Sequence, residues 1–142
     1  LHDALPILIG VDLDEAWAFL NVAQGETLSN KLVRAGRAMN AGVYFVTQSS
    51  GDVSKESLKN NIGLKFSFRS TDTNEIKQTL EFFGLDSEDE NNQKRLRDLE
   101  NGQCLMQDLY GRVGVVQIHP VFVELLHAFD TRPPIKSEVD LE

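Results

Sequence analysis

The sequence predicts an α/β domain in which a mainly parallel sheet is covered by helices. Two observations favour this class. Short apolar runs alternate with segments whose apolar residues recur at helical spacing, and one of the runs, Val43–Val46, is β-branched and aromatic. The 142 residues suffice for one domain with its own core, and the apolar and charged fractions of 41% and 25% are ordinary for a globular protein. We therefore expect one globular unit.

The first half of this unit is predicted to alternate strands and helices. In order, these are a strand over 8–13, a short helix or turn over 16–22, a helix over 27–39 and a strand over 43–46. The longer helix carries its apolar residues at spacings near 3.6, and Asn40–Gly42 ends it. Each strand ends in a polar pair, Asp14–Glu15 for the first and Thr47–Gln48 for the second.

The second half is predicted to hold a strand, two helices, a hairpin and a last helix. The expected elements are a strand over 65–69, a helix ended by Gly84, a helix after Ser87, a hairpin of 102–109 and 113–118, and a helix opened by Pro120. Asp72 with Glu75 predicts a capping box for the first helix, and Ser87 with Glu90 predicts another for the second. The last helix is expected to turn its apolar residues inward, namely Phe122, Leu125, Leu126 and Phe129.

The ends of the chain are expected to differ from this domain. Residues 1–7 resemble the translation of a sequencing adapter, so we expect a non-native leader and a protein that continues upstream. Residues 133–142 begin with two prolines and end in charged residues, and are expected to be disordered. The predicted domain occupies residues 8–132.

Charge, cysteine content and hydropathy exclude several classes of protein. The formal net charge of −8 argues against a free-standing protein that coats nucleic acid and leaves room for local DNA contacts alone. The single cysteine, Cys104, favours a reducing compartment and a buried, unreactive thiol. No apolar stretch approaches the roughly 20 residues that span a bilayer, so we expect a soluble fragment.

The polar pairs at the two strand ends predict a nucleotide site. Ligands of open parallel sheets bind beyond the carboxyl ends of the strands, where Asp14, Glu15, Thr47 and Gln48 would share one crevice. Asp14 could hold Mg²⁺, directly or through water, and Glu15 could deprotonate the water that attacks a γ-phosphate. Gln48 suits a residue that senses that phosphate or positions the water. The alternative is that Asp14 and Glu15 merely cap the following helix.

Three cations lie at spacings of three on the predicted helix 27–39. They are Lys31, Arg34 and Arg37. One interpretation is a solvated basic face. The other is that arginines reach a neighbour's nucleotide in a ring-shaped motor and stabilise charge on the transferred phosphoryl group. Sequence spacing does not choose between them.

Several segments resemble the C-terminal motor motifs of conjugative type IV secretion ATPases, in the HerA and FtsK superfamily. The resemblance is to the VirB-type transfer ATPases of Gram-positive conjugative elements. The main segments are 11–17 (VDLDEAW), 32–42 (LVRAGRAMNAG) and 46–49 (VTQS), and the further ones are 60–63, 69–72, 101–103 and 108–114. The resemblance therefore covers nearly all of residues 8–132.

The resemblance implies the C-terminal part of a RecA-like P-loop NTPase domain that uses ATP and Mg²⁺. It implies Asp14 and Glu15 as the Walker B carboxylates, Gln48 as the polar strand-end residue, and Arg34 or Arg37 as arginine fingers. It also implies a cytoplasmic homo-oligomer, expected to be a hexamer, at the inner face of the cell membrane. Such a motor would act with conjugation channel proteins, powering channel assembly or substrate transfer.

Two departures from the family pattern affect these expectations. No Gly-x-x-x-x-Gly-Lys-Ser/Thr loop occurs in the chain, so the fragment alone should not hydrolyse ATP. Asp12 also interrupts the apolar run of the Walker B strand. Two alternatives therefore stand beside the motor. One is a non-hydrolysing module that docks on the transfer channel through the helices of 72–101, and the other is a DNA-pumping coupling protein, although no extended basic or aromatic DNA groove is predicted.

The remaining polar and aromatic residues receive simpler interpretations. His119 and His127 have no partners spaced as in a zinc site, so no metal beyond Mg²⁺ is expected. Arg112, at the predicted hairpin tip, is interpreted as solvated. Trp17 is expected to pack in the core rather than to form an adenine platform.

Overall fold

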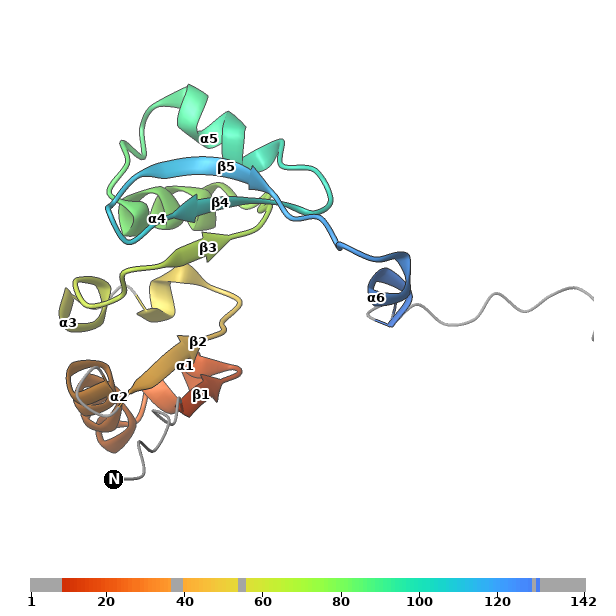
Figure 1. Ribbon diagram of the computed structural model, residues 1–142. Coiled ribbons are helices and arrows are strands. Elements are labelled where there is room, and N and C mark those ends of the chain that lie inside the picture. The colour runs from red at the N-terminus through yellow and green to blue at the C-terminus, as the bar shows by residue number, and fades with distance from the viewer. Residues whose placement is uncertain (1–8, 37–39, 54–55, 129, 131–142) are drawn as a thin grey trace, which may run out of the picture.

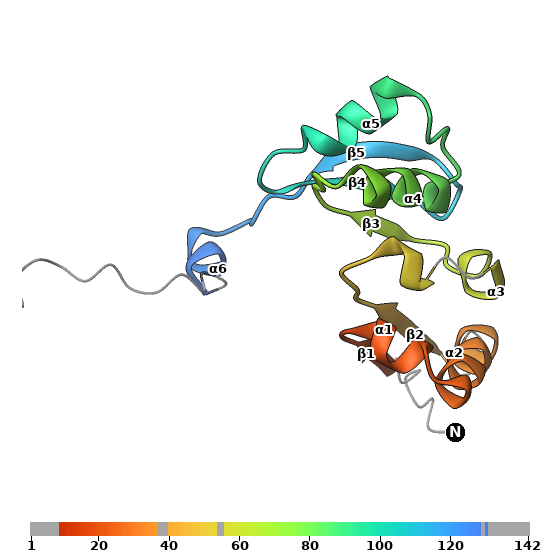
Figure 2. The same cartoon turned by 180° about the vertical axis from the view of Figure 1, so that it is seen from behind.

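The computed structural model describes residues 9–36, 40–53, 56–128 and 130 of the chain. Figures 1 and 2 show the arrangement of these residues from opposite sides. The expected leader (1–7) and disordered tail (133–142) lie outside the described residues. No helix in the described part is long and apolar enough to cross a membrane.

Two parallel strands form the N-terminal half of the fold. β1 (Ile9–Leu13) pairs with β2 (Ala41–Phe45) in register from Ile9 opposite Ala41 to Leu13 opposite Phe45. α1 (Ala16–Leu20) and α2 (Ala23–Ala35) connect them, as the helical spacing predicts. The α/β class with a parallel sheet is therefore confirmed, and the carboxyl ends of both strands lie at one edge.

α2 begins earlier than its expected start at Thr27. Glycine is a poor helix former, so the sequence favoured a start after Gly25. In the structure Gly25 lies inside the helix, and a Cβ there would lie 1.9 Å from the carbonyl oxygen of Phe19 in α1. The glycine thus allows the close approach of the two helices. The expected end of the helix, at residues 37–39, lies outside the described residues.

The second half is an antiparallel sheet covered by two helices. Its strands lie in the order β3 (Lys65–Ser67), β4 (Gln103–Gln107) and β5 (Val113–Gln117). The hairpin of β4 and β5 is confirmed, with Gln103 opposite Gln117. The third expected strand, β3, pairs antiparallel with the hairpin, so the described strands form a two-stranded parallel sheet and a three-stranded antiparallel sheet instead of the expected mainly parallel sheet.

Both expected helices, α4 (Thr73–Phe83) and α5 (Glu90–Arg97), are present in this half. Asp72 caps α4 by accepting a hydrogen bond from the Glu75 amide at 2.8 Å, but the Glu75 side chain is used elsewhere and does not complete the capping box. The prediction that Ser87 caps α5 is wrong. Asp89 takes that place and accepts from the Asn91 amide at 2.8 Å, because an aspartate directly before the helix is an equally good cap.

The carboxyl end of α4 is closed by a glycine and two lysines. Gly84 adopts φ 74° and ends the helix as expected. Lys59 Nζ donates to the carbonyl oxygen of Glu81 at 2.6 Å, and Lys65 Nζ donates to that of Phe82 at 2.9 Å. These cations satisfy last-turn carbonyls and lie at the negative end of the helix dipole.

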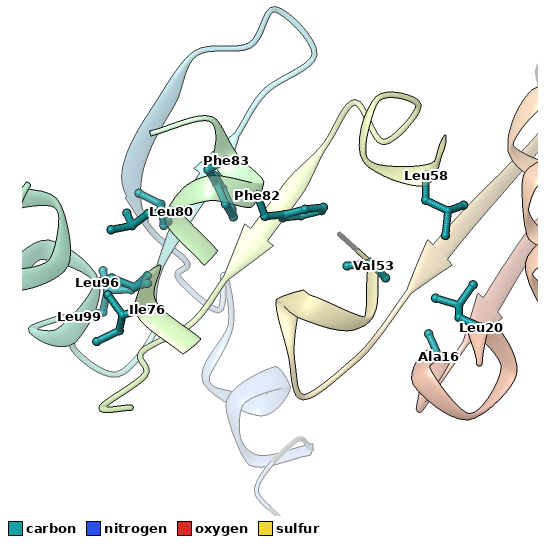
Figure 3. Close-up of a cluster of buried hydrophobic side chains, with 11 residues drawn as sticks. Ala16, Leu20, Val53, Leu58, Ile76, Leu80, Phe82, Phe83, Leu96 and Leu99 are labelled. Atoms are coloured by element: carbon teal, nitrogen blue, oxygen red, sulfur yellow. The ribbon is translucent and has the colours of Figure 1, made fainter. Parts of the chain in front are cut away.

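One hydrophobic core runs through both halves (Figure 3). It extends from α1 past η2 (Ser50–Val53) and α3 (Glu56–Lys59) to α4 and α5. Its buried residues are Ala16, Leu20, Val53, Leu58, Ile76, Leu80, Phe82, Phe83, Leu96, Leu99 and Leu105. The two halves therefore share packing as well as the connecting chain.

The last helix, α6 (Val123–Ala128), contradicts its prediction. It stands away from the rest of the fold in Figure 1 and has no buried residue among those described. Phe122, Leu125 and Leu126, expected to face inward, are exposed, and Phe129 lies outside the described residues. Apolar spacing identifies the apolar face of a helix but does not identify the surface that covers it.

Candidate nucleotide site

Glu15 and Gln48 meet where the two parallel strands end. The strand ends are tied by backbone hydrogen bonds of 2.9 Å from Val46 N to Leu13 O and from Ala16 N to Val46 O. Just beyond them, Gln48 Nε2 donates to Glu15 Oε1 at 2.9 Å, across 33 residues of sequence. The structure thus brings together a carboxylate and an amide that the sequence placed at the same edge.

Glu15 has an unusual backbone conformation. Its φ of 51° and ψ of 47° are left-handed, which costs a residue with a Cβ about 1–2 kcal/mol. The Asp14 carboxylate partly offsets this cost, because Asp14 Oδ1 accepts from the Glu15 amide at 3.0 Å. Although Glu15 stands at the N-cap of α1, its side chain makes no capping hydrogen bond. The helix-capping alternative therefore does not account for the placement of the Glu15 carboxylate.

Trp17 contacts the site instead of the core. Its indole Nε1 donates to Glu15 Oε2 at 2.6 Å, and the residue is 46% exposed. The expectation of core packing is therefore wrong. Because Ala16 and Leu20 occupy the inner side of this short helix, Trp17 is left on its outer side. Each carboxylate oxygen of Glu15 thus has one donor, from Trp17 or from Gln48, and the carboxylate is held without being buried.

Thr47 lies next to this pair but its hydroxyl is directed elsewhere. Thr47 Oγ1 donates to Asp52 Oδ2 at 2.7 Å and accepts from the Ser49 amide at 3.4 Å. The side chain stabilises the loop after β2 and has no contact with Glu15 among the described hydrogen bonds.

Glu75 of α4 is a site residue that the sequence did not reveal. Its carboxylate accepts three hydrogen bonds from the segment directly after Gln48. The donors are Ser49 Oγ at 2.8 Å, Ser50 N at 2.7 Å and Ser50 Oγ at 2.9 Å. Glu75 lies 25 residues beyond Ser50, and its local pattern indicated a capping box, so no sequence signal pointed to this contact.

The basic residues of α2 do not reach the Glu15 site of the same chain. Gly36, just after the helix, approaches Ala41 so closely that a Cβ would lie 2.7 Å from the Ala41 carbonyl oxygen. The end of α2 therefore lies beside the start of β2, at the opposite edge of the sheet from Glu15. Arg34 is exposed in the last turn of α2, Lys31 is exposed one turn earlier, and Arg37 lies outside the described residues.

The carboxylate available at the strand end fits a magnesium ion that is held partly by nucleotide. Within the described residues, no three His, Cys, Asp or Glu side chains gather as a metal site. Mg²⁺ is commonly held by one or two carboxylates, with waters and phosphate oxygens completing its shell. Asp14 is exposed at the strand end and can serve as such a single carboxylate ligand.

The cysteine and histidines show no comparable arrangement. Cys104 is fully buried, which confirms its predicted burial, and burial raises the pKa of its thiol. His119 and His127 are both exposed.

Comparison with known proteins agrees with this architecture. A family model described as an AAA-like domain matches residues 7–129. The chain belongs to the AAA-like domain family. This AAA-like domain is 34% identical over 119 residues to the uncharacterized protein YddE of Bacillus subtilis (strain 168). The match covers 84% of the chain but 14% of YddE, so the chain spans a small part of that relative's length.

Solved structures show the same fold for a distant NTPase. The AAA-like domain is similar to the genome packaging NTPase B204 from Sulfolobus turreted icosahedral virus 2, solved in complex with AMPPCP and with ATP-gammaS. The TM-score is 0.59 and the sequence identity is 15% in both comparisons. The similarity covers 78% of this chain and 54% or 52% of the viral chains.

Proposed function

We propose that this AAA-like domain is the part of an ATP-hydrolysing motor that supplies the catalytic base. The carrying observation is the 2.9 Å hydrogen bond between Gln48 Nε2 and Glu15 Oε1 at the ends of two parallel strands. Family membership supports an ATP-driven motor. The sequence resemblance supports the finer proposal that the motor serves a conjugative type IV secretion system.

The chemistry follows from the polar groups at the strand ends. As water attacks the γ-phosphorus, Glu15 would accept one of its protons, and the bond from the γ-phosphorus to the leaving ADP oxygen would break. Gln48, within hydrogen-bond reach of Glu15, is placed to orient that water or to donate to the γ-phosphate. Asp14 would hold Mg²⁺, which supplies neutralisation of phosphate charge when bound. The loop that cradles the phosphates does not occur in these 142 residues, so we propose that the rest of the full-length protein supplies it.

The position of Arg34 supports a ring of identical subunits. A helix of thirteen residues is about 20 Å long, so Arg34 is far from the Glu15 site of its own chain. An arginine at the opposite edge could instead stabilise phosphoryl charge at a neighbour's site. We therefore propose a homo-oligomer. The sequence resemblance supports the finer proposal of a hexamer that works at the inner face of the membrane with channel proteins.

Replacing the base tests the hydrolysis proposal directly. In the full-length protein, Glu15→Gln should lower phosphate release about 100-fold or more while ATP binding, measured with a fluorescent analogue, persists. Asp12→Asn is the matched control, because it removes an exposed carboxylate from the same strand outside the Glu15–Gln48 pair. Unchanged turnover in Glu15→Gln would defeat the base assignment and leave the docking module as the better explanation.

A further inference from the structure

Glu75 fixes the chain on the downstream side of Gln48. Its Oε1 accepts from both the amide and the hydroxyl of Ser50, and its Oε2 accepts from the hydroxyl of Ser49. Hydrogen bonds to a charged carboxylate are stronger than those between neutral groups. One side chain of α4 therefore holds both residues that follow Gln48.

Further hydrogen bonds join the same loop to α4. Thr79, one turn after Glu75, donates from its buried hydroxyl to Ser50 Oγ at 3.1 Å. Within the loop, Ser49 Oγ also accepts from the Gly51 amide at 3.2 Å. The loop after β2 is thus joined to α4 by side chains from two successive turns of that helix.

α4 is itself well anchored. Ile76 and Leu80, on the same helix, are 0% and 1% exposed in the shared core. Asp72 caps its first turn, and two lysines donate to carbonyls of its last turn. Glu75 therefore transmits the position of a rigid element to the loop.

The side chain of Gln48 depends on this loop for its direction. Gln48 is exposed, so packing does not fix the path of its amide toward Glu15. Upstream, the strand is fixed by the hydrogen bonds of Val46 with Leu13 and Ala16. Downstream, the hydrogen bonds of Ser49 and Ser50 described above tie the loop to α4.

We propose that Glu75 is a positioning residue that keeps the Gln48 amide aligned with Glu15, and that it couples α4 to the nucleotide site. This inference rests on the proposed function, since the alignment affects turnover only if Glu15 and Gln48 act in hydrolysis. Glu75 does not itself touch Glu15 or Gln48. Its loss is therefore expected to change kcat through the alignment of Gln48.

The first test removes the Glu75 carboxylate from the full-length protein. Glu75→Ala should lower kcat about tenfold or more, since small displacements of catalytic groups have large effects, while KM for ATP stays within about twofold. Glu75→Gln should retain most of the activity, because its amide oxygen can still accept from Ser50. Glu81→Ala is the matched control on the same helix, where the carboxylate contacts Ser87 instead of the loop, and it should leave kcat unchanged.

A double-mutant cycle separates positioning from a general loss of structure. If Glu75 acts through Gln48, the variant carrying both Glu75→Ala and Gln48→Ala should be no slower than Gln48→Ala alone. Multiplying effects would overturn the inference, as would a wild-type kcat in Glu75→Ala. If Glu75→Ala does not fold, the combined Ser49→Ala and Ser50→Ala variant removes the two hydroxyl donors from the other side and keeps the Ser50 amide, so it should also lower kcat, by a smaller factor. A wild-type kcat there would equally overturn the inference.

Glu15→Gln, measured in parallel, distinguishes failure of the positioning role from failure of the proposed function. Loss of turnover in Glu15→Gln with normal turnover in Glu75→Ala would overturn the positioning role alone. Normal turnover in Glu15→Gln would overturn the proposed function and the positioning role together.

Discussion

Lys65 offers a direct test of how the second half of the fold is stabilised. The residue is 8% exposed in β3, and its ammonium lies 4.6 Å from the centroid of the Phe82 ring while donating to the Phe82 carbonyl. Burial, and to a lesser extent the nearby charge of Lys59, holds the pKa of Lys65 below its usual 10.5. The perturbation is Lys65→Met, which keeps an unbranched side chain and removes the charge.

The expected change in stability is the difference between opposing terms. Removing the ammonium loses a hydrogen bond from a charged donor, about 1.5–3 kcal/mol, and a cation–π contact, about 0.5–2 kcal/mol. It also relieves the burial of a charge, which costs several kcal/mol per ion in proteins. The lowered pKa of Lys65 indicates that burial outweighs the preference of the site for the charged form. We therefore expect Lys65→Met to change the free energy of unfolding by about 1 kcal/mol or less at pH 7.

The pH dependence gives the sharper outcome. Between the folded-state pKa of Lys65 and 10.5, the unfolded chain binds more protons than the folded protein, so stability rises with pH in that window. Below the folded-state pKa of Lys65, the contribution of its ionisation to stability is constant and unfavourable. Urea unfolding followed by circular dichroism, from pH 7 to pH 10, should show wild type gaining stability relative to Lys65→Met. A constant difference between the two, or a loss above about 2 kcal/mol at pH 7, would refute the reasoning.

Two further predictions use matched substitutions and the same urea assay. Leu80→Ala, at a side chain 1% exposed in the core, should lower the free energy of unfolding by about 2–5 kcal/mol. Leu109→Ala, at a side chain 76% exposed, should change it by no more than about 0.5 kcal/mol. Similar losses at both positions would contradict the assigned core. Gly84→Ala should lower the free energy of unfolding by about 1 kcal/mol, because φ at Gly84 is 74° although no atom lies within 4 Å of the added Cβ. Gly114→Ala is equally unobstructed and has no positive φ, so it should leave that free energy unchanged. An equal effect of the two substitutions would show that the backbone conformation is not the cause.

The sequence predicts the proximity of Glu15 and Gln48 well, because that proximity depends on local strand patterns and on the parallel topology of the sheet. Apolar runs identify β1 and β2, and parallel strands place their carboxyl ends at one edge. Glu15 and Gln48 therefore had to lie near each other, although 33 residues separate them. The hairpin and the Asp72 cap were predictable for a similar reason, since turns and caps depend on residues close together in the chain.

The failures occur where one pattern permits several tertiary partners. α6 has an apolar face, but its residues do not specify a covering surface, and in the structure that face remains exposed. Gly25 lies within α2 although glycine is a poor helix former, and its close contact with α1 is a tertiary feature that helix propensity does not include. Trp17 resembled a core residue because indole is mostly apolar, yet its N–H bonds to Glu15.

Glu75 shows how a tertiary contact can outweigh a correct local pattern. In a capping box its carboxylate would accept one backbone amide hydrogen bond at the start of α4. The structure keeps the Asp72 half of that pattern and gives the Glu75 carboxylate three donors from the loop after β2. Three charge-assisted bonds exceed one, so the exchange is favourable, and it leaves the negative charge near the positive end of the α4 dipole. The consequence is mechanical: any movement of α4 relative to the parallel strands must either carry the Gln48 loop with it or break these bonds.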